Sequence, residues 1–188
     1  MKITNFFVVL TFFILTACGG DESNTVNPDA ALTGTWEAQE FTANVTTTTE
    51  ISGDVTEAKI DIEGKNLNYQ LIISETDYNT EGSYGYEGNM EVGGNRSSFD
   101  ESVANVNGNG TYRVEESEFI SDGAFFDFDF QGMNIAAAQG ETKATIIKLT
   151  DTELIFSQDE ESTVEQSQGG TTFTITSKTE SRSVWKRK

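Results

Sequence analysis

The chain has 188 residues, of which 12 are basic, 31 are acidic and none is histidine, and its net charge is −19 at pH 7. A hydrophobic content of 36% is sufficient for one folded domain, whereas the negative charge excludes nucleic-acid binding through Lys/Arg contacts to phosphate. With no histidine and a single cysteine, Cys18, the chain cannot form a Ser-His-Asp or Cys-His catalytic unit, an internal disulfide, or a zinc, copper or haem site built on those ligands.

Residues 1–17 have the pattern of an export signal. Lys2 gives a positive start, and an apolar run of 12 residues follows from Phe6 to Ala17. Because a membrane-spanning helix needs about 20 apolar residues, we expect a cleaved signal peptide rather than an anchor helix. Leu15-Thr16-Ala17-Cys18 resembles the lipobox of bacterial lipoproteins, which implies that Cys18 becomes the lipidated first residue. A plain secretory signal with a coincidental cysteine is the alternative.

Residues 18–31 are expected to hold the lipidated cysteine and a flexible linker, because they show no apolar periodicity and contain the only proline. The acidic pair Asp21-Glu22 resembles the surface-export signal of lipoproteins from Bacteroidetes-type bacteria, and an acidic linker without that role is the alternative. We therefore expect a cell-envelope protein attached to the outer membrane through Cys18, with exposure at the cell surface left open.

The domain is expected to span residues 32–188, where apolar and polar residues alternate with the period of a β-strand. Residues 36–38 and residues 41–45 alternate out of phase, which predicts a bulge near Gln39. Gly64-Lys65 is expected to turn the chain into the next strand. The apolar face of that strand carries Leu67, Tyr69, Leu71 and Ile73, and that of the following strand carries Tyr84, Tyr86, Met90 and Val92.

The middle of the chain is expected to contain a short helix and a turn. Ser98 and Glu101 fit a capping box, and Phe99, Val103 and Val106 have helical spacing. Residues 107–110 read Asn-Gly-Asn-Gly, which predicts a turn before a strand that continues toward Phe119.

A phenylalanine stripe at Phe126, Phe128 and Phe130 alternates with Asp127 and Asp129. Calcium needs 6–8 oxygen ligands, and nothing nearby repeats the dense spacing of a calcium loop, so we expect neither a metal site nor a cofactor. The stripe lines a cavity for an apolar ligand or forms a solid core, and the core is favoured because small barrels fill themselves with side chains. The other candidate lining residues are Tyr69, Leu71, Tyr84 and Tyr86.

The last part of the chain reads as strands over residues 142–149, 153–157 and 171–185. Eight to ten strands joined by short turns, without a crossover helix, predict antiparallel pairing. Closure of such a meander into an up-and-down barrel removes its exposed edges, so an all-β barrel is the expected fold. A two-sheet β-sandwich is the alternative.

Several short motifs resemble lipocalins and the lipocalin-like lipoproteins of Bacteroidetes. These are the Gly34-Thr35-Trp36 turn, the Asn109-Gly110-Thr111-Tyr112 segment, the Leu149–Leu154 hairpin and the Val184-Trp185-Lys186-Arg187 end. The resemblance implies that Gly34, Trp36 and Arg187 close one end of the barrel, with Arg187 stacked on Trp36. It also implies a small apolar or amphipathic ligand that enters at the mouth opposite Trp36.

Two functions remain open from the sequence. The first is a lipocalin-like lipoprotein that binds a small hydrophobic ligand. The second is an acidic interaction or inhibitor module that binds a basic protein partner and carries no small molecule. Only carboxylate, hydroxyl, Lys or Arg chemistry is available, and no spacing selects a carboxylate pair for glycoside hydrolysis, so we expect no enzymatic activity.

Overall fold

The structure, a computed structural model, describes residues 25–26, 31–123, 125–126, 129–130, 133–134, 141–168 and 171–188. The strands are β1 (Thr25–Val26), β2 (Gly34–Ile51), β3 (Asp54–Ile73), β4 (Asp77–Val92), β5 (Asn95–Glu115), β6 (Glu118–Ser121), β7 (Asp129–Phe130), β8 (Met133–Asn134), β9 (Thr142–Leu149), β10 (Glu153–Gln168) and β11 (Thr171–Arg187). Within these described ranges no helix is long and apolar enough to cross a membrane. The signal peptide and most of the linker predicted for residues 1–31, Cys18 included, lie outside the described residues.

Eight strands form one antiparallel ring in the order β2-β3-β4-β5-β6-β9-β10-β11, and β11 pairs back onto β2. Four residue pairs between β6 and β9 close the ring on its shortest side. β1 pairs in parallel with the end of β9, and among the described strands β7 pairs only with β8. The predicted all-β, lipocalin-like up-and-down barrel is confirmed, in preference to the sandwich, because every neighbour in the ring is a neighbour along the chain once β7 and β8 are set aside.

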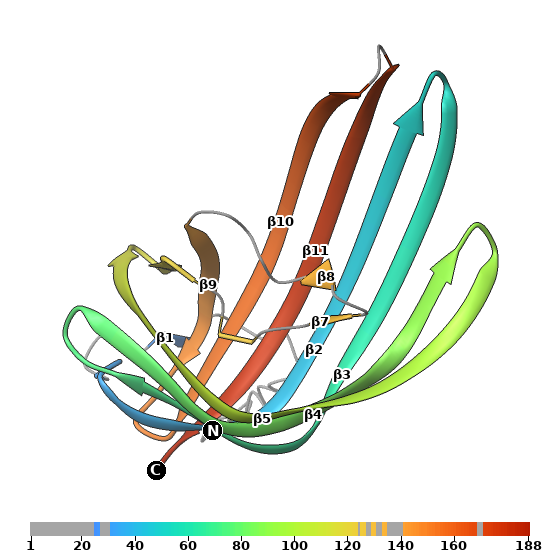
Figure 1. The fold of residues 1–188 in the computed structure, drawn as a ribbon. Coiled ribbons are helices and arrows are strands. Elements are labelled where there is room, and N and C mark those ends of the chain that lie inside the picture. The colour runs from blue at the N-terminus through green and yellow to red at the C-terminus, as the bar shows by residue number, and fades with distance from the viewer. Residues whose placement is uncertain are drawn as a thin grey trace, which may run out of the picture.

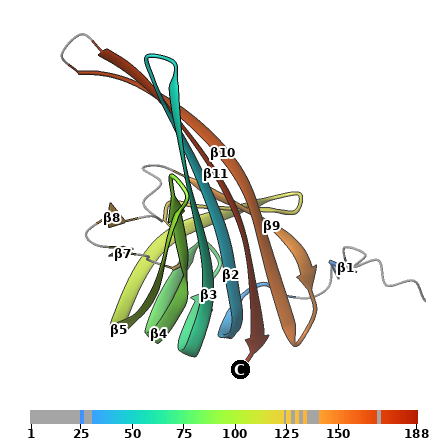
Figure 2. The same cartoon turned by 90° about the vertical axis from the view of Figure 1, so that its right-hand side faces the viewer.

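The strands of the ring differ greatly in length. All eight strands therefore pair into a ring at one end of the barrel, and four of them continue beyond the ring at the other end. β10 runs to Gln168, but β9 pairs with it only as far as Ser157. The β3–β4 ladder likewise begins at Ala58, which leaves the β2–β3 hairpin to continue alone. The hairpins β2–β3 and β10–β11 rise together past the rest of the barrel, and the C-terminus lies at the opposite, closed end (Figures 1 and 2).

Two regions of the barrel are named here by their position. The base is the closed end, where β2 begins and β11 ends. The distal sheet is the four-stranded extension in the order β10-β11-β2-β3, made of residues 48–57, 163–168 and 171–176. Among the described strands it is a single layer, since the ladders to β4 and β9 end before they reach it.

A bulge at Gln39 explains the phase change in the first strand. Val184 pairs with Glu40 and Trp185 pairs with Ala38, so Gln39 has no partner on β11. The extra residue turns both apolar sets inward, and Trp36 and Phe41 are buried on either side of it. The predicted bulge is confirmed.

The turn predicted at Gly64-Lys65 is wrong, because β3 continues through these residues and the hairpin turn lies earlier, at Ser52-Gly53. A second bulge produces the misleading pattern. The ladder to β4 shifts register between Lys65 and Asn68, and Asn66 has a φ of 50°. The bulge changes the inward phase from even to odd residues, which imitates a break between two strands.

The helix predicted around residues 98–106 and the turn predicted at 107–110 are also wrong, because both segments lie inside β5. Asn105 bulges with a φ of 56°, and the ladder to β4 shifts there. Phe99 and Val103 face inward four residues apart, and the bulge lets Val106 face inward after three more residues. Spacings of four and three residues are those of one face of a helix, so the strand resembles a helix in sequence. The glycines at 108 and 110 do not turn the chain. They face Thr80 and Tyr78, whose side chains occupy the space that a Cβ would need.

The core lies at the base. The largest fully buried side chains are Trp36, Trp185, Tyr69, Phe119, Leu71, Ile120 and Leu154. They come from the parts of β2, β3, β6, β10 and β11 that lie nearest the base. Burial of each such side chain contributes about 1.5–3 kcal/mol, so the stability of the domain is concentrated at this end.

Candidate functional site

The base is closed by one arginine. The guanidinium carbon of Arg187 lies 4.1 Å from the ring centroid of Trp36, so the predicted contact is present. Arg187 Nη1 donates to the carbonyl of Thr33 at 2.9 Å, and Nε donates to the carbonyl of Asp151 at 2.8 Å. The second amino group donates to the carbonyl of Ala31. One side chain thus ties the entry of β2 to the β9–β10 turn.

Gly34 allows this closure. Its φ is 142°, and a Cβ there would overlap the guanidinium of Arg187. Trp36 is fully buried beneath the guanidinium, and its Nε1 donates to the carbonyl of Leu32 at 2.9 Å. Gly34, Trp36 and Arg187 therefore act together as a structural clamp at the base.

The candidate cavity residues meet in the interior above the base. Tyr69, Leu71, Tyr84, Tyr86 and Phe126 are each at most 5% exposed. Phe128 and the side chain of Phe130 lie outside the described part of the structure. The five described residues pack against one another as part of a single buried cluster.

Phe126 is the centre of this packing. It follows β6 in a segment that is not a strand, and its ring packs against side chains of the adjacent strands β11, β2, β3 and β4. Its centroid lies 4.3 Å from that of Phe41, 5.2 Å from that of Tyr69 and 5.5 Å from that of Trp185. The Tyr69 hydroxyl donates to the carbonyl of Phe125, which fixes the segment in place. At these distances the rings are in contact, as in a protein core.

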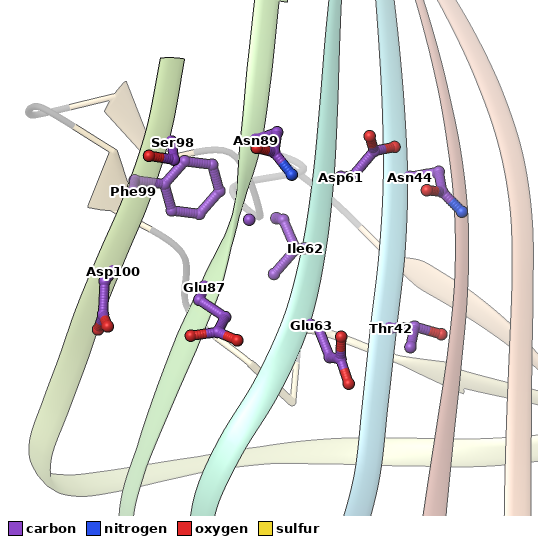
Figure 3. Close-up of a pocket in the computed structure, with 11 residues that line it drawn as sticks. Thr42, Asn44, Asp61, Ile62, Glu63, Glu87, Asn89, Ser98, Phe99 and Asp100 are labelled. Atoms are coloured by element: carbon purple, nitrogen blue, oxygen red, sulfur yellow. The ribbon is translucent and has the colours of Figure 1, made fainter. Parts of the chain in front are cut away.

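A polar groove lies on the outer face of β2, β3, β4 and β5 and encloses about 730 Å³ (Figure 3). Two rows of side chains cross the four strands at matching register. The first row is Asn44, Asp61, Asn89 and Ser98, and the second is Thr42, Glu63, Glu87 and Asp100. Alternation along each strand places these residues on the face opposite the core.

The floor of the groove depends on a close approach between strands. Ile62, Gly88 and Phe99 lie behind the polar rows. A Cβ at Gly88 would overlap the carbonyl of Asp61 and would meet the ring of Phe99 at 2.8 Å. Glycine is therefore required at position 88, because any side chain there would collide with the backbone of β3 and with the Phe99 ring.

The groove holds more negative charge than its neighbours neutralise. Lys65 Nζ lies 3.3 Å from a carboxylate oxygen of Glu87 and also pairs with Asp100, and these carboxylates raise the pKa of Lys65. Asp61 and Glu63 form no ion pair within the described residues. These two carboxylates, with the amides of Asn44 and Asn89 on either side of Asp61, can accept hydrogen bonds from a cationic group.

The same polar face continues onto β11 and β10. A second groove of about 420 Å³ shares Thr42 and Asn44 with the first. There Lys178 pairs with Glu180 and lies 3.9 Å from Asp159, while Arg182 lies 3.5 Å from Glu40. The cations on this side are already paired, so they leave Asp61 and Glu63 without an ion pair among the described residues.

Carboxylates are numerous among the described residues. Among them there is no group of three or more His, Cys, Asp or Glu side chains that could hold a metal ion. Burial raises the pKa of the Tyr78 phenol, with Asp122 adding to the effect, and Arg113 lowers the pKa of Glu141. Both shifts run away from neutral pH.

The sequence did not single out the groove. Its residues stand on four strands and come together only through the register of the sheet, so no local motif marks them. The one local signal is the alternation of polar residues at 61, 63, 87 and 89, which also fits an ordinary solvated face. Comparisons of the chain with protein-family models, with curated proteins and with solved structures find no match.

Proposed function

We propose that the chain is an outer-membrane lipoprotein, anchored through Cys18, whose barrel binds a cationic protein partner in the outer-face groove. The observation that carries this proposal is the pair of carboxylates at Asp61 and Glu63, which lie exposed in a concave polar surface and form no ion pair among the described residues. The net charge of −19 supports it, because a negative protein attracts a cationic partner over distances of about 10 Å.

The packed interior favours binding on the exterior. The five described residues that the sequence offered as a cavity lining are buried against one another around Phe126. A ligand at that position would have to displace this ring. The outer groove needs no rearrangement to receive a side chain from a partner.

The proposed anchor also gives the domain an orientation. Arg187 holds the backbone of residues 31–33 at the base, so the linker from Cys18 approaches the barrel there. With Cys18 in the membrane, the base faces the bilayer and the distal sheet points away from it. At about 3.3 Å per residue, the 18 residues of β2 extend roughly 60 Å from the base.

The anchor predicts a defined labelling result. When the full chain is produced in bacteria that process lipoproteins, it should incorporate radiolabelled palmitate and sediment with the envelope. The Cys18→Ser variant changes one atom and removes the thiol that is acylated, so it should lose the label and move to the soluble envelope fraction. Label or membrane attachment that persists in Cys18→Ser would contradict the proposal.

Partner binding is tested by affinity purification of the full chain from envelope extracts. We expect a basic protein to copurify at low salt and to be released at high salt. Asp61→Asn combined with Glu63→Gln should reduce its recovery about tenfold, equal to about 1.4 kcal/mol. The matched control is Glu75→Gln combined with Glu116→Gln, which removes the same charge from exposed turns and should leave recovery unchanged. Equal loss in both pairs would reject the groove.

A small apolar or amphipathic ligand is the second candidate. It is favoured by the half-buried side chains of Ile60 and Met90, which continue the inward face of β3 and β4 above Phe126. Solvent extraction of the same purified protein separates the two functions. A lipid-like molecule recovered in a one-to-one ratio, from protein that copurifies with no partner at low salt, would favour the ligand and reject the docking role.

A further inference from the structure

Four apolar side chains gather on one face of the distal sheet. Val164 pairs with Ile175, and Phe173 pairs with Ile51 on the neighbouring strand. Ile175 and Phe173 are two residues apart on β11, so all four side chains point to the same side. Val164 is 49% exposed and Ile51 is 45% exposed, and none of the four belongs to the buried core or packs against it. We call this set the distal patch.

The distal patch continues the inward face of the barrel. No register shift separates Ile51 from Val45, which is buried on the same side of β2. The opposite face of the distal sheet is polar, with threonines and glutamates at most positions. Strands that alternate in this way normally have one face covered, and an exposed apolar cluster on a single-layer sheet is typical of an interaction surface.

The negative charge around the distal patch favours a partner that carries positive charge. Residues 48–57 and 163–176 contain Glu50, Asp54, Glu57 and Glu165 and no lysine or arginine. Asp54 is paired with Ile51, beside the patch, while the glutamates lie on the other face of the same layer. A single sheet layer is thinner than the Debye length of about 8–10 Å, so these charges act on whatever covers the patch.

We infer that the distal patch is a second docking surface, independent of the groove, for a protein segment with apolar residues on one face and Lys or Arg at its margins. The apolar face covers Val164, Phe173, Ile175 and Ile51, and the cations lie near Asp54, with the glutamates attracting them from the other face of the sheet. A second copy of this chain would bring two distal sheets of like charge together. An anionic lipid surface would meet the same repulsion.

The test uses a defined probe, a short fluorescent peptide of alternating Val and Lys, titrated against the purified full chain by anisotropy. We expect saturable binding, with about tenfold weaker binding for the Ser–Lys analogue and none for the Val–Glu analogue. Ile175→Asp should weaken binding of the Val–Lys peptide about tenfold. Thr174→Asp adds the same charge one residue away on the opposite face, and it should bind as well as the parent or better.

The outcomes separate the surfaces. Asp61→Asn combined with Glu63→Gln should leave peptide binding unchanged, because Asp61 lies seven residues along β3 from Asp54, about 23 Å at 3.3 Å per residue, which is beyond the Debye length. The milder Ile175→Thr should show an intermediate loss and guards against misfolding of the Asp variant. Equal binding by Ile175→Asp and the parent would overturn the inference. Dimerisation in sedimentation experiments, or binding to phosphatidylglycerol vesicles, that is lost in Ile175→Asp would also overturn it, in favour of a second copy or a lipid surface.

Discussion

The Phe126→Ala variant is expected to lose about 3–4 kcal/mol of unfolding free energy, a large share of the 5–15 kcal/mol typical of a domain. The ring is 5% exposed, and its centroid lies 5.3 Å from that of Tyr84 in addition to its contacts with Phe41, Tyr69 and Trp185. Removing it leaves a cavity that the rigid walls of the barrel cannot close. Urea denaturation followed by tryptophan fluorescence measures the loss, since Trp185 is a direct neighbour.

Two controls show whether the effect arises from packing. Phe126→Leu keeps most of the volume and should cost less than about 1.5 kcal/mol. Val114→Ala removes a side chain that is 43% exposed and should change stability by less than about 0.5 kcal/mol. A loss below about 1 kcal/mol in Phe126→Ala would mean that the interior already has room. That result would strengthen the small-ligand candidate at the expense of external docking.

The fold could be predicted because its determinants are local. Short turns and two-residue alternation are visible in the sequence. A meander without crossover connections leaves two edge strands exposed, and pairing these two strands to form a barrel removes both edges. The bulge at Gln39 could be predicted for the same reason. The apolar residues change from even positions at Trp36 to odd positions at Phe41, and this change is visible within a few consecutive residues. The contact between Arg187 and Trp36 was predicted from the resemblance to lipocalins, because 150 residues of chain separate the two residues and no local pattern connects them.

The errors have one physical cause. A bulge at Asn66 and another at Asn105 each insert a residue into a continuous strand, and each then looks like the end of an element. The Asn-Gly-Asn-Gly run at 107–110 has turn composition, but its small residues serve to clear Thr80 and Tyr78 on the neighbouring strand. Local patterns cannot distinguish a glycine that turns the chain from one that makes room for a partner strand.

The groove and the distal patch could not be predicted because they depend on register between strands. Asp61 becomes a candidate site only when Asn44 and Asn89 are known to lie on either side of it. The distal patch similarly requires Val164 to pair with Ile175, and no local pattern indicates how far β10 and β11 continue as partners. Surfaces assembled across strands carry the proposed functions, whereas the base, which short motifs and a family resemblance predicted, carries stability.

Arg187→Ala is expected to cost about 2 kcal/mol of unfolding free energy. Hydrogen bonds from a charged donor contribute about 1.5–3 kcal/mol, and the half-buried position of Arg187 places the loss toward the lower end of that range. The variant removes the donors to Thr33 and Asp151 together with the contact over Trp36. Thermal and urea unfolding of the full chain measure it, and proteolysis should cut the chain near residues 31–33 sooner.

Arg187→Lys distinguishes the shape of the guanidinium from its charge. Lysine keeps the cation but cannot direct three planar donors to three carbonyls while stacking on an indole, so it should recover less than half of the loss. Lys186→Ala is the matched control, because it removes a neighbouring cation that is exposed, and it should stay within about 0.5 kcal/mol of the parent. Full recovery by Arg187→Lys would mean that charge alone closes the base. A loss of unfolding free energy that is restricted to Arg187 variants would show that the clamp fixes residues 31–33, which lead into β2. The clamp would then also fix where the linker joins the barrel.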